Sequence, residues 1–357
     1  MFQIFVDRDA DNNPIARIRY SACDRYAECT KAFHEQYESI VLLPSRKEFR
    51  RKLRPVKDRM CRFCGKKSPE VTFKTAAHLI PSFLGNGFLF SDFECDDCNN
   101  FHSLFESNLT YYMGMSVPFH PNLSRARQRK VKNFENDLEV GTGIFEKIGP
   151  EVAIQIVSDG SGKNHFTIDE SGKKLTVNFA RKTYVPLLVY KAILKMALSA
   201  MPVDYVYKYR RAFAFLMGSY EPPTEGNMIF QVYAFVHPGP QYNYPIGIIW
   251  EKKNKDSRMN THHFQLLFKN YSFQLALPYF DDDLWMYDGQ ENLLMVAPPC
   301  IDKAFAEKFG VPIFQTLNFS NKDPVKGDPQ EVTFTFNEVL FKEGSIDHND
   351  KGEGLSV

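Results

Sequence analysis

Four cysteines in two close pairs are the residues whose types and spacing point most directly to chemistry. Cys61 and Cys64 form one Cys-x2-Cys pair, and Cys95 and Cys98 form a second. Each pair holds two thiolates on one side of a tight turn, and two such turns complete a tetrahedral site of four sulfurs that suits Zn²⁺. The alternative is four free thiols that meet by chance. A closed four-sulfur site has no open position, so we expect this zinc to hold the fold and not to react.

The elements that must position this chemistry lie between and after the pairs. Residues 72–77 (TFKTAA) read as a strand, and residues 88–94 (FLFSDFE) read as the strand that returns beside it. Asp96 or Asp97 is placed to cap a helix that starts near the second pair and runs to about residue 112. The predicted order is β-β-α.

Polar residues on these elements are expected to face one another. His78 follows directly on the first strand. On the helix, Asn99, His102 or Ser103, and Glu106 recur at three- and four-residue spacing and therefore share a face. Because the helix is tethered to the zinc by its own cysteine, this stripe is expected to keep a fixed relation to His78.

The order of these motifs resembles the HNH endonuclease family, the ββα-metal nucleases, in its zinc-ribbon form. The motifs that carry the resemblance are CRFC, AHLIP, LGN and CDDCN. They cover about residues 61–109, under a sixth of the chain. The resemblance implies hydrolysis of phosphodiester bonds with a catalytic divalent cation, Mg²⁺ or Mn²⁺, beside the structural Zn²⁺.

The resemblance also implies roles for individual residues. His78 takes the place of the general base that activates a water for in-line attack. Asn99 takes the place of a ligand of the catalytic cation. A middle residue of the family orients the histidine; Asp92 lies nearest that place in the sequence, and Asn86 is the other candidate.

One departure from the family pattern concerns the cation. Ala77 stands where many members carry an aspartate that binds the metal. Glu106 is the first choice for the missing ligand, with His102 and Asp92 behind it, because hard cations prefer oxygen ligands. If no carboxylate substitutes, the module would bind nucleic acid without cutting it.

Each of these residues also has a plainer interpretation. His78 is then a buried histidine that caps a turn, Asn99 a turn residue after the zinc-binding loop, and Glu106 a solvated carboxylate on a helix.

Two basic segments flank the module. The first carries eight basic residues against Glu48 and Asp58, and its charge reads either as a solvated helix face or as contacts to phosphates. The residues expected to contact nucleic acid are Arg50, Arg51, Lys52 and Arg54 before the cysteines and Arg125, Arg127, Arg129 and Lys130 after them.

Composition sets the frame for the whole chain. It has 357 residues, 43% hydrophobic, with 44 Lys+Arg against 43 Asp+Glu, which excludes a wholly disordered chain and favours two or three domains. The 32 Phe and 17 Tyr favour β structure. Seven cysteines, an odd number, argue against a disulfide framework. No membrane segment or secretory leader is expected, and the chain reads as cytoplasmic.

We expect an α+β protein in four parts. Residues 1–59 form a lead-in of strands, a helix and the basic segment, and residues 60–140 form the HNH module. Residues 141–342 form a larger, β-rich targeting or regulatory domain, and residues 343–357 a flexible tail. Within the third part, residues 186–200 predict a largely buried helix that begins at a proline, among strands that include residues 293–297.

The sequence therefore predicts a metal-dependent HNH endonuclease. Its expected partner is nucleic acid, with double-stranded DNA first, and no membrane. In layout the chain resembles restriction enzymes and the HNH effectors of anti-phage systems, in which a C-terminal domain senses a small nucleotide or modified DNA. This resemblance implies a role in restriction or anti-phage defence. Two alternatives stay open: a zinc-stabilised nucleic-acid-binding protein with a degenerate module, and a nuclease gated by a small nucleotide. A homo-oligomer is also left open.

Overall fold

A computed structural model describes most of the chain. The described residues are 3–8, 14–19, 21–50, 52–118, 130–143, 153–158, 165–221, 227–287, 295–299 and 301–335. They form an α+β protein with several sheets, as predicted. The predicted tail at residues 343–357 lies outside this range.

Contacts between residues divide the described chain into two compact units. The first lies within Met1–Tyr112 and Tyr184–Val325, and the second within Met113–Pro118, Gln128–Thr183 and Lys326–Val357. Both cysteine pairs belong to the first unit. The functional division expected from the sequence is a separate matter and stays a prediction.

An antiparallel six-stranded sheet organises the first unit. Its strands, in spatial order, are β15 (Ile313–Asn318), β11 (Gln231–Val236), β14 (Tyr271–Ala276), β13 (His262–Lys269), β12 (Tyr242–Lys252) and β3 (Tyr37–Pro44). The edge strand β3 precedes the cysteines in the chain, whereas its partner β12 follows them, with Leu42 opposite Ile248. The sheet therefore joins segments on both sides of the module.

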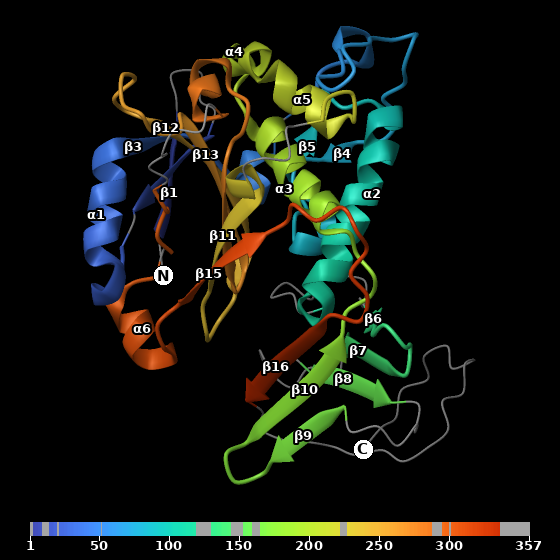
Figure 1. The fold of residues 1–357 in the computed structure, drawn as a ribbon, viewed down its shortest axis with the longest axis vertical. Helices are drawn as coiled ribbons and strands as arrows, with labels where there is room; N and C mark the ends of the chain where they lie inside the picture. The colour runs from blue at the N-terminus through green and yellow to red at the C-terminus, as the bar shows by residue number, and fades with distance from the viewer. Residues whose placement is uncertain are drawn as a thin grey trace. The chain divides into compact units, whose positions relative to one another are not determined.

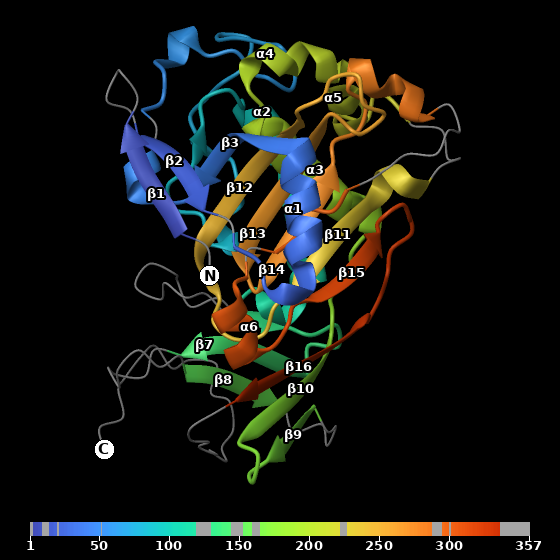
Figure 2. The same ribbon diagram turned by 90° about the vertical axis from the view of Figure 1, so that its left-hand side faces the viewer.

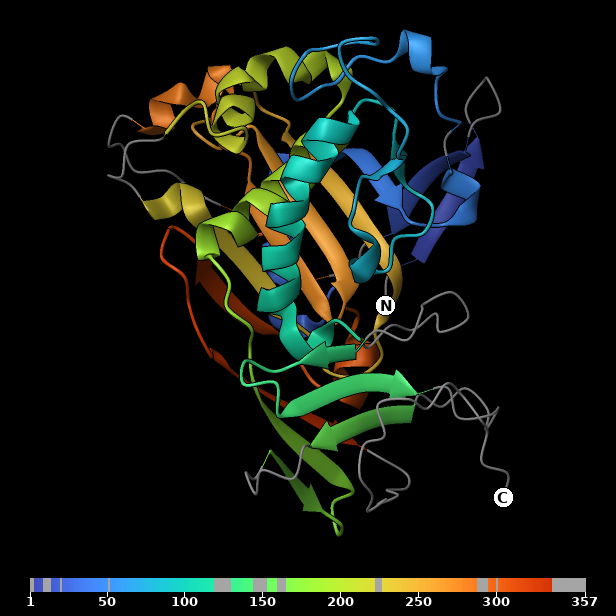
Figure 3. The same ribbon diagram turned by 90° about the vertical axis from the view of Figure 1, so that its right-hand side faces the viewer.

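Helices cover both faces of this sheet. Figure 2 shows α1 (Ala27–Gln36) lying across one face, with α6 (Lys303–Phe309) near its end. Figure 3 shows α2 (Asp96–Met113) and α3 (Pro186–Ala200) on the opposite face. Every residue of β13 is buried as a result.

The face under α1 carries an aromatic and aliphatic core. Phe33 of α1 stacks on Tyr37 and meets Trp250 edge to face. Phe305 of α6 belongs to the same cluster of buried residues. Burial of large aromatic side chains is the main source of stability in such a core.

Most predicted elements of the first unit are confirmed. Helix α3 has the predicted bounds and is largely buried. The expected first strands form a hairpin, β1 (Gln3–Arg8) with β2 (Pro14–Arg19). In the described part of the basic segment there are two short turns, η2 (Lys47–Phe49) and η3 (Val56–Asp58), and no α-helix face. The strand expected at 293–297 is wrong for its described residues, 295–297, which form no regular structure.

Short helical elements complete the first unit. They are η1 (Asp24–Tyr26), η4 (Ser82–Leu84), α4 (Val203–Val206), η6 (Tyr207–Tyr209), α5 (Arg210–Leu216), η7 (Asn227–Phe230) and η8 (Asp281–Tyr287).

The second unit consists of two small antiparallel sheets and a turn, η5 (Gly114–Ser116). Its strands are β6 (Lys130–Lys132), β7 (Leu138–Gly143) and β8 (Ala153–Ser158) in one sheet and β16 (Pro329–Thr335), β10 (Lys174–Ala180) and β9 (Phe166–Asp169) in the other. The Gln330 side chain accepts a hydrogen bond from the Met115 amide at 2.9 Å and donates to the Met113 carbonyl at 3.3 Å.

Among the described residues, none of the helices combines the length and the apolar character needed to cross a membrane. Figure 1 labels most of the strands and helices and colours them from blue to red along the chain.

Candidate functional site

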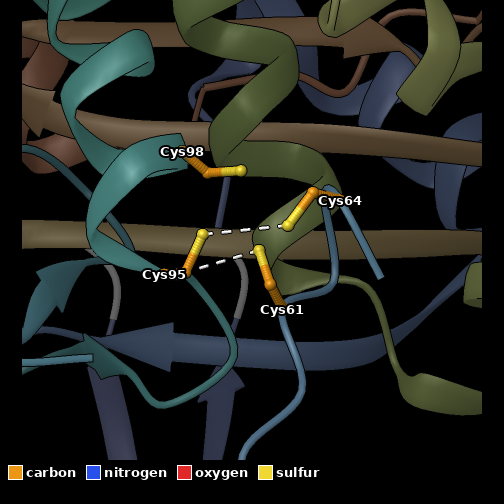
Figure 4. Close-up of side chains that lie close together, drawn as sticks. All are labelled: Cys61, Cys64, Cys95 and Cys98. Atoms are coloured by element: carbon orange, nitrogen blue, oxygen red, sulfur yellow. Dashed lines mark hydrogen bonds between the residues drawn. The ribbon is translucent and has the colours of Figure 1, made fainter. Parts of the chain in front are cut away.

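The four cysteine sulfurs converge on one point. Figure 4 shows Cys61 and Cys64 on one loop facing Cys95 and Cys98 at the entrance to α2. All four sulfurs lie within 4.8 Å of one another, and those of Cys64 and Cys95 are 3.8 Å apart. Four sulfurs at the usual zinc distance of about 2.3 Å would lie roughly 3.8 Å apart at the corners of a tetrahedron. The cysteines are therefore positioned to bind a metal such as Zn²⁺.

Backbone hydrogen bonds shape the loop that carries the first cysteine pair. The Cys61 amide donates to the Lys66 carbonyl at 2.8 Å, and the Gly65 amide donates to the Cys61 carbonyl at 2.9 Å. Gly65 has a φ of 73°, a value that glycine adopts without strain. A hydrogen bond with Cys98 lowers the pKa of the Cys61 thiol and raises that of Cys98. Cysteine binds a metal as the thiolate, so a bound cation would displace the protons of these thiols.

The ββ hairpin between the pairs is much shorter than predicted. Only β4 (Ala77–His78) and β5 (Phe90–Ser91) form a ladder, with His78 opposite Phe90. The preceding backbone bonds to a side chain instead, because the amides of Lys74 and Thr75 donate to the Asp96 carboxylate at 2.9 and 2.8 Å.

Helix α2 begins at Asp96, slightly earlier than the start near the second cysteine pair that the sequence predicted. Burial opposes the ionisation of Asp96, but the hydrogen bonds from Thr72, Lys74 and Thr75 outweigh burial and lower its pKa. Its carboxylate thus ties the start of α2 to the segment that leads into β4.

His78 lies half-buried at the end of β4. Its ring packs against the Phe90 ring, with centroids 4.7 Å apart. Its backbone carbonyl accepts a hydrogen bond from the Lys195 ammonium of α3 at 3.1 Å. The strand that presents His78 is therefore held by a residue far away in the sequence.

Asn86 closes the loop between β4 and β5. Its side chain is buried, and its Nδ2 donates to the carbonyls of Ile80 and Leu89 at 2.6 and 2.9 Å. Its Oδ1 accepts from the amides of Phe88 and Leu89 and from the Ser45 hydroxyl, at 3.1, 2.9 and 2.6 Å. This one amide fixes the path of the chain after His78 and ties it to the end of β3.

Asp92 is held by Arg54. The Arg54 amide and its Nε both donate to Oδ2 of Asp92, at 2.9 and 2.8 Å, and Nη2 donates to Oδ1 at 3.1 Å. Burial raises the pKa of Asp92 in part, but Arg54 outweighs it, so the pKa lies below its usual range.

The polar stripe of α2 divides between interior and surface. Asn99 and Glu106 are half-exposed, whereas His102 is fully buried. Nδ1 of His102 lies 2.7 Å from Oε1 of Glu94, and its ring packs on Phe63 at 4.5 Å between centroids. Ser103 is exposed, so Asn99, Ser103 and Glu106 are the residues of the stripe that an entering ligand could reach.

Glu106 meets the same lysine as His78. Its Oε1 lies 3.5 Å from Nζ of Lys195. Burial raises the pKa of Glu106 despite the nearby ammonium. Strand β4 and helix α2 thus approach a single ammonium group, which places the His78 peptide and the Glu106 carboxylate in one site.

Three residues of this site were not expected from the sequence. Lys195 and Glu94 form a buried ion pair at 3.1 Å, with side chains 1% and 0% exposed. Arg62, between the first two cysteines, donates to the carbonyls of Leu198, Ser199 and Met201 at the end of α3, at 2.9, 3.1 and 2.8 Å. The available signal was a polar stripe of Lys191, Lys195 and Ser199 on an otherwise largely apolar predicted helix.

The residues predicted to contact nucleic acid fall into three groups. Arg50 and Lys52 are exposed. Arg54 and Lys130 are engaged in ion pairs, with Asp92 and with Glu139 at 2.8 and 2.9 Å. Outside the described residues lie Arg51, Arg125, Arg127 and Arg129.

Comparison with known proteins identifies the segment around these residues. Residues 61–105 match a family described as HNH endonuclease. This range contains all four cysteines and the predicted catalytic residues. No curated protein and no solved structure matches the chain.

Proposed function

We propose that this protein, whose residues 61–105 form an HNH endonuclease module with four cysteines placed for a metal, is a metal-dependent endonuclease. The observation that carries the proposal is the approach of β4 and α2 to one ammonium group. This brings the peptide of His78 and the carboxylate of Glu106 within 3.1 and 3.5 Å of Nζ of Lys195. The proposed base and a proposed cation ligand then belong to one site.

His78 is the proposed general base. A neutral imidazole, with an ordinary pKa of about 6.5, accepts a proton from water near neutral pH. Asn99 and Glu106 are the proposed ligands of Mg²⁺ or Mn²⁺, and Glu106 supplies the carboxylate that Ala77 cannot. A bound cation stabilises the negative charge that develops on the phosphoryl and leaving oxygens.

The orienting role passes from Asp92 to Asn86 in this proposal. Asn86 holds the loop after His78 through four backbone groups, while Asp92 is engaged by Arg54. His102 is not carried forward as a cation ligand, because it is fully buried and bonded to Glu94.

The proposed substrate is double-stranded DNA, since the family mostly cuts DNA. Exposed Arg50 and Lys52 would contact the phosphate backbone without reading sequence. A role in restriction or anti-phage defence is the biological setting that we propose, with residues 141–342 contributing targeting or regulation.

The second candidate is a nucleic-acid-binding protein with a degenerate module, and Ala77 is the observation in its favour.

Plasmid cleavage distinguishes the candidates. Plasmid is incubated with wild type and with His78→Ala, in Mg²⁺, in Mn²⁺ and in chelator. A nuclease requires cutting by wild type with a divalent cation, alone or after cell extract is added, and a loss of about 10²- to 10⁴-fold in rate for His78→Ala, with DNA binding retained. Binding by both proteins without cutting by either, even after cell extract is added, would establish the second candidate.

The third candidate is a nuclease gated by a small nucleotide, and a hollow in the first unit is the observation in its favour. The first unit has a hollow of about 400 Å³ lined by two aromatic rings, four basic side chains and three carboxylates. Tyr205 and Phe280 would stack on a base, and Lys255 and Arg258 would meet its phosphates. Wild type that is inactive alone but cuts plasmid after cell extract is added would support gating.

A further inference from the structure

We propose that Lys195 of α3 is a positioning residue for the HNH site: its ammonium sets the place of His78 relative to α2. This inference rests on the proposed nuclease function. Lys195 lies outside residues 61–105, so the part of the chain that follows the module would complete the site.

The ammonium has three donors and meets three acceptors. Nζ of Lys195 lies 3.1 Å from the His78 carbonyl, 3.1 Å from Oε2 of Glu94 and 3.5 Å from Oε1 of Glu106. A lysine ammonium donates hydrogen bonds and accepts none; here it donates to the His78 carbonyl and to Glu106 and forms an ion pair with Glu94. The side chain is 1% exposed, so no solvent competes for these contacts.

The three acceptors come from three different parts of the module. His78 ends β4, Glu94 directly precedes the second cysteine pair, and Glu106 lies in the middle of α2. Glu94 is bonded in turn to His102, which fixes the rotation of α2 about its axis. One cation therefore sets the distance between the strand with the proposed base and the helix with the proposed metal ligands.

Folding alone does not explain a charge at this place. Taking an ammonium and a carboxylate out of water is costly, and well-packed apolar residues of similar volume are often as stable as a buried ion pair. Helix α3 is otherwise largely buried and apolar, so a variant that removes both the Lys195 and the Glu94 charges could keep the fold. What an apolar side chain cannot supply is a donor to the His78 carbonyl. Misplacing a catalytic group by about 1 Å can cost roughly 10²-fold in rate.

Lys191 provides a matched control on the same helix. It lies about one turn before Lys195, and its Nζ donates to the Phe215 carbonyl at 2.8 Å and lies over the Phe215 ring. Lys191→Met removes a partly buried ammonium from α3 but leaves the contacts of Lys195 in place.

The experiment is single-turnover cleavage of plasmid DNA by full-length protein at saturating enzyme. Wild type, Lys195→Met, Lys195→Arg and Lys191→Met are compared, with zinc content and DNA affinity measured on the same samples. A structural defect lowers the amplitude of the cleavage reaction, because a smaller fraction of the protein is active. Misplacement of His78 instead lowers the single-turnover rate constant. We expect the rate constant of Lys195→Met to fall about 100-fold with zinc and DNA affinity retained. Lys195→Arg should recover about tenfold of this loss, and Lys191→Met should stay within about threefold of wild type.

Lys195→Met leaves the buried Glu94 carboxylate without its ion-pair partner, and this alone could unfold the protein. A second variant controls for that effect. Glu94→Gln with Lys195→Met removes both buried charges, and we expect it to bind zinc and still cut slowly. Cutting by either Lys195→Met variant at the wild-type rate constant would overturn the inference while leaving the nuclease intact. Loss of zinc from both would assign Lys195 to folding and overturn it equally. Failure of wild type to cut with any divalent cation, or after extract is added, would instead reject the nuclease function.

Discussion

Among single residues, Asn86 and Asp92 show how two polar side chains of one hairpin differ in what they do. Both were candidates for orienting His78. Asn86 is 4% exposed and bonds to four backbone groups of the loop, whereas Asp92 lies in an ion pair whose Arg54 side chain is 53% exposed. Exposed ion pairs contribute about 0–1 kcal/mol, and unsatisfied buried polar groups cost about 1–3 kcal/mol each.

Asn86→Ala is therefore expected to lower the free energy of unfolding by about 3 kcal/mol or more, because it leaves buried amides and carbonyls without partners. Asp92→Asn should cost less than about 1 kcal/mol and change the cleavage rate less than about threefold. Urea unfolding and plasmid cleavage measure both, and Asn100→Ala, an exposed asparagine of α2, serves as the control. A large loss of cleavage in Asp92→Asn at unchanged stability would return the orienting role to Asp92.

At the scale of elements, strand β13 carries polar residues through the centre of the sheet. Nε2 of His263 lies 3.1 Å from the Tyr37 hydroxyl, and its Nδ1 accepts from Gln274 at 3.0 Å. Burial, with a smaller effect of His262, lowers the pKa of His263 to about 3. The folded protein thus keeps this imidazole neutral at pH values where the unfolded chain protonates it.

The lowered pKa of His263 makes the free energy of unfolding fall as pH falls. The unfolded imidazole titrates near 6.5, so the contribution of neutral His263 is complete above that pH. It declines as pH falls towards about 3, by up to about 1.4 kcal/mol per pH unit. Urea unfolding between pH 6 and 4 should show a steeper fall of the free energy of unfolding with pH in wild type than in His263→Gln. The difference in slope should correspond to about one proton bound on unfolding. Equal slopes would show that His263 is protonated in the folded protein.

The elements also show what the sequence can predict. Helix α3 was placed correctly because Pro186 suits a first helical position and the apolar residues after it need burial. The strands around His78 were predicted too long, because Asp96 takes amides that a ladder would otherwise use. The contact of Lys195 with His78 joins residues 117 positions apart, and no local pattern reports such a contact.

For the molecule as a whole, charge rather than shape governs the expected encounter with DNA. The chain is near neutral, so attraction to phosphates depends on local basic residues. Arg50 and Lys52 are exposed, whereas Lys130 is in an ion pair with Glu139.

The double variant Arg50→Ala with Lys52→Ala should weaken DNA binding at 100 mM salt. It should also reduce the slope of log K against log salt concentration by about two, since each lost phosphate contact removes about 0.9 from that slope. Fluorescence anisotropy with a labelled duplex gives the slope, and Lys130→Ala is the comparison, with a smaller expected change. An unchanged slope in the double variant would exclude this segment from the DNA interface.

The pairing of β3 with β12 has a consequence for the order in which the protein becomes able to act. A ribosome releases Cys98 before it has made Lys195, and it releases both before the far half of the central sheet. A nascent chain would already hold metal at its cysteines while the strand before them still lacked its neighbour. On the roles proposed above, the emerging polypeptide could not cut the cell's own chromosome efficiently until Lys195 had left the ribosome. The order of synthesis and folding would therefore delay the proposed nuclease activity.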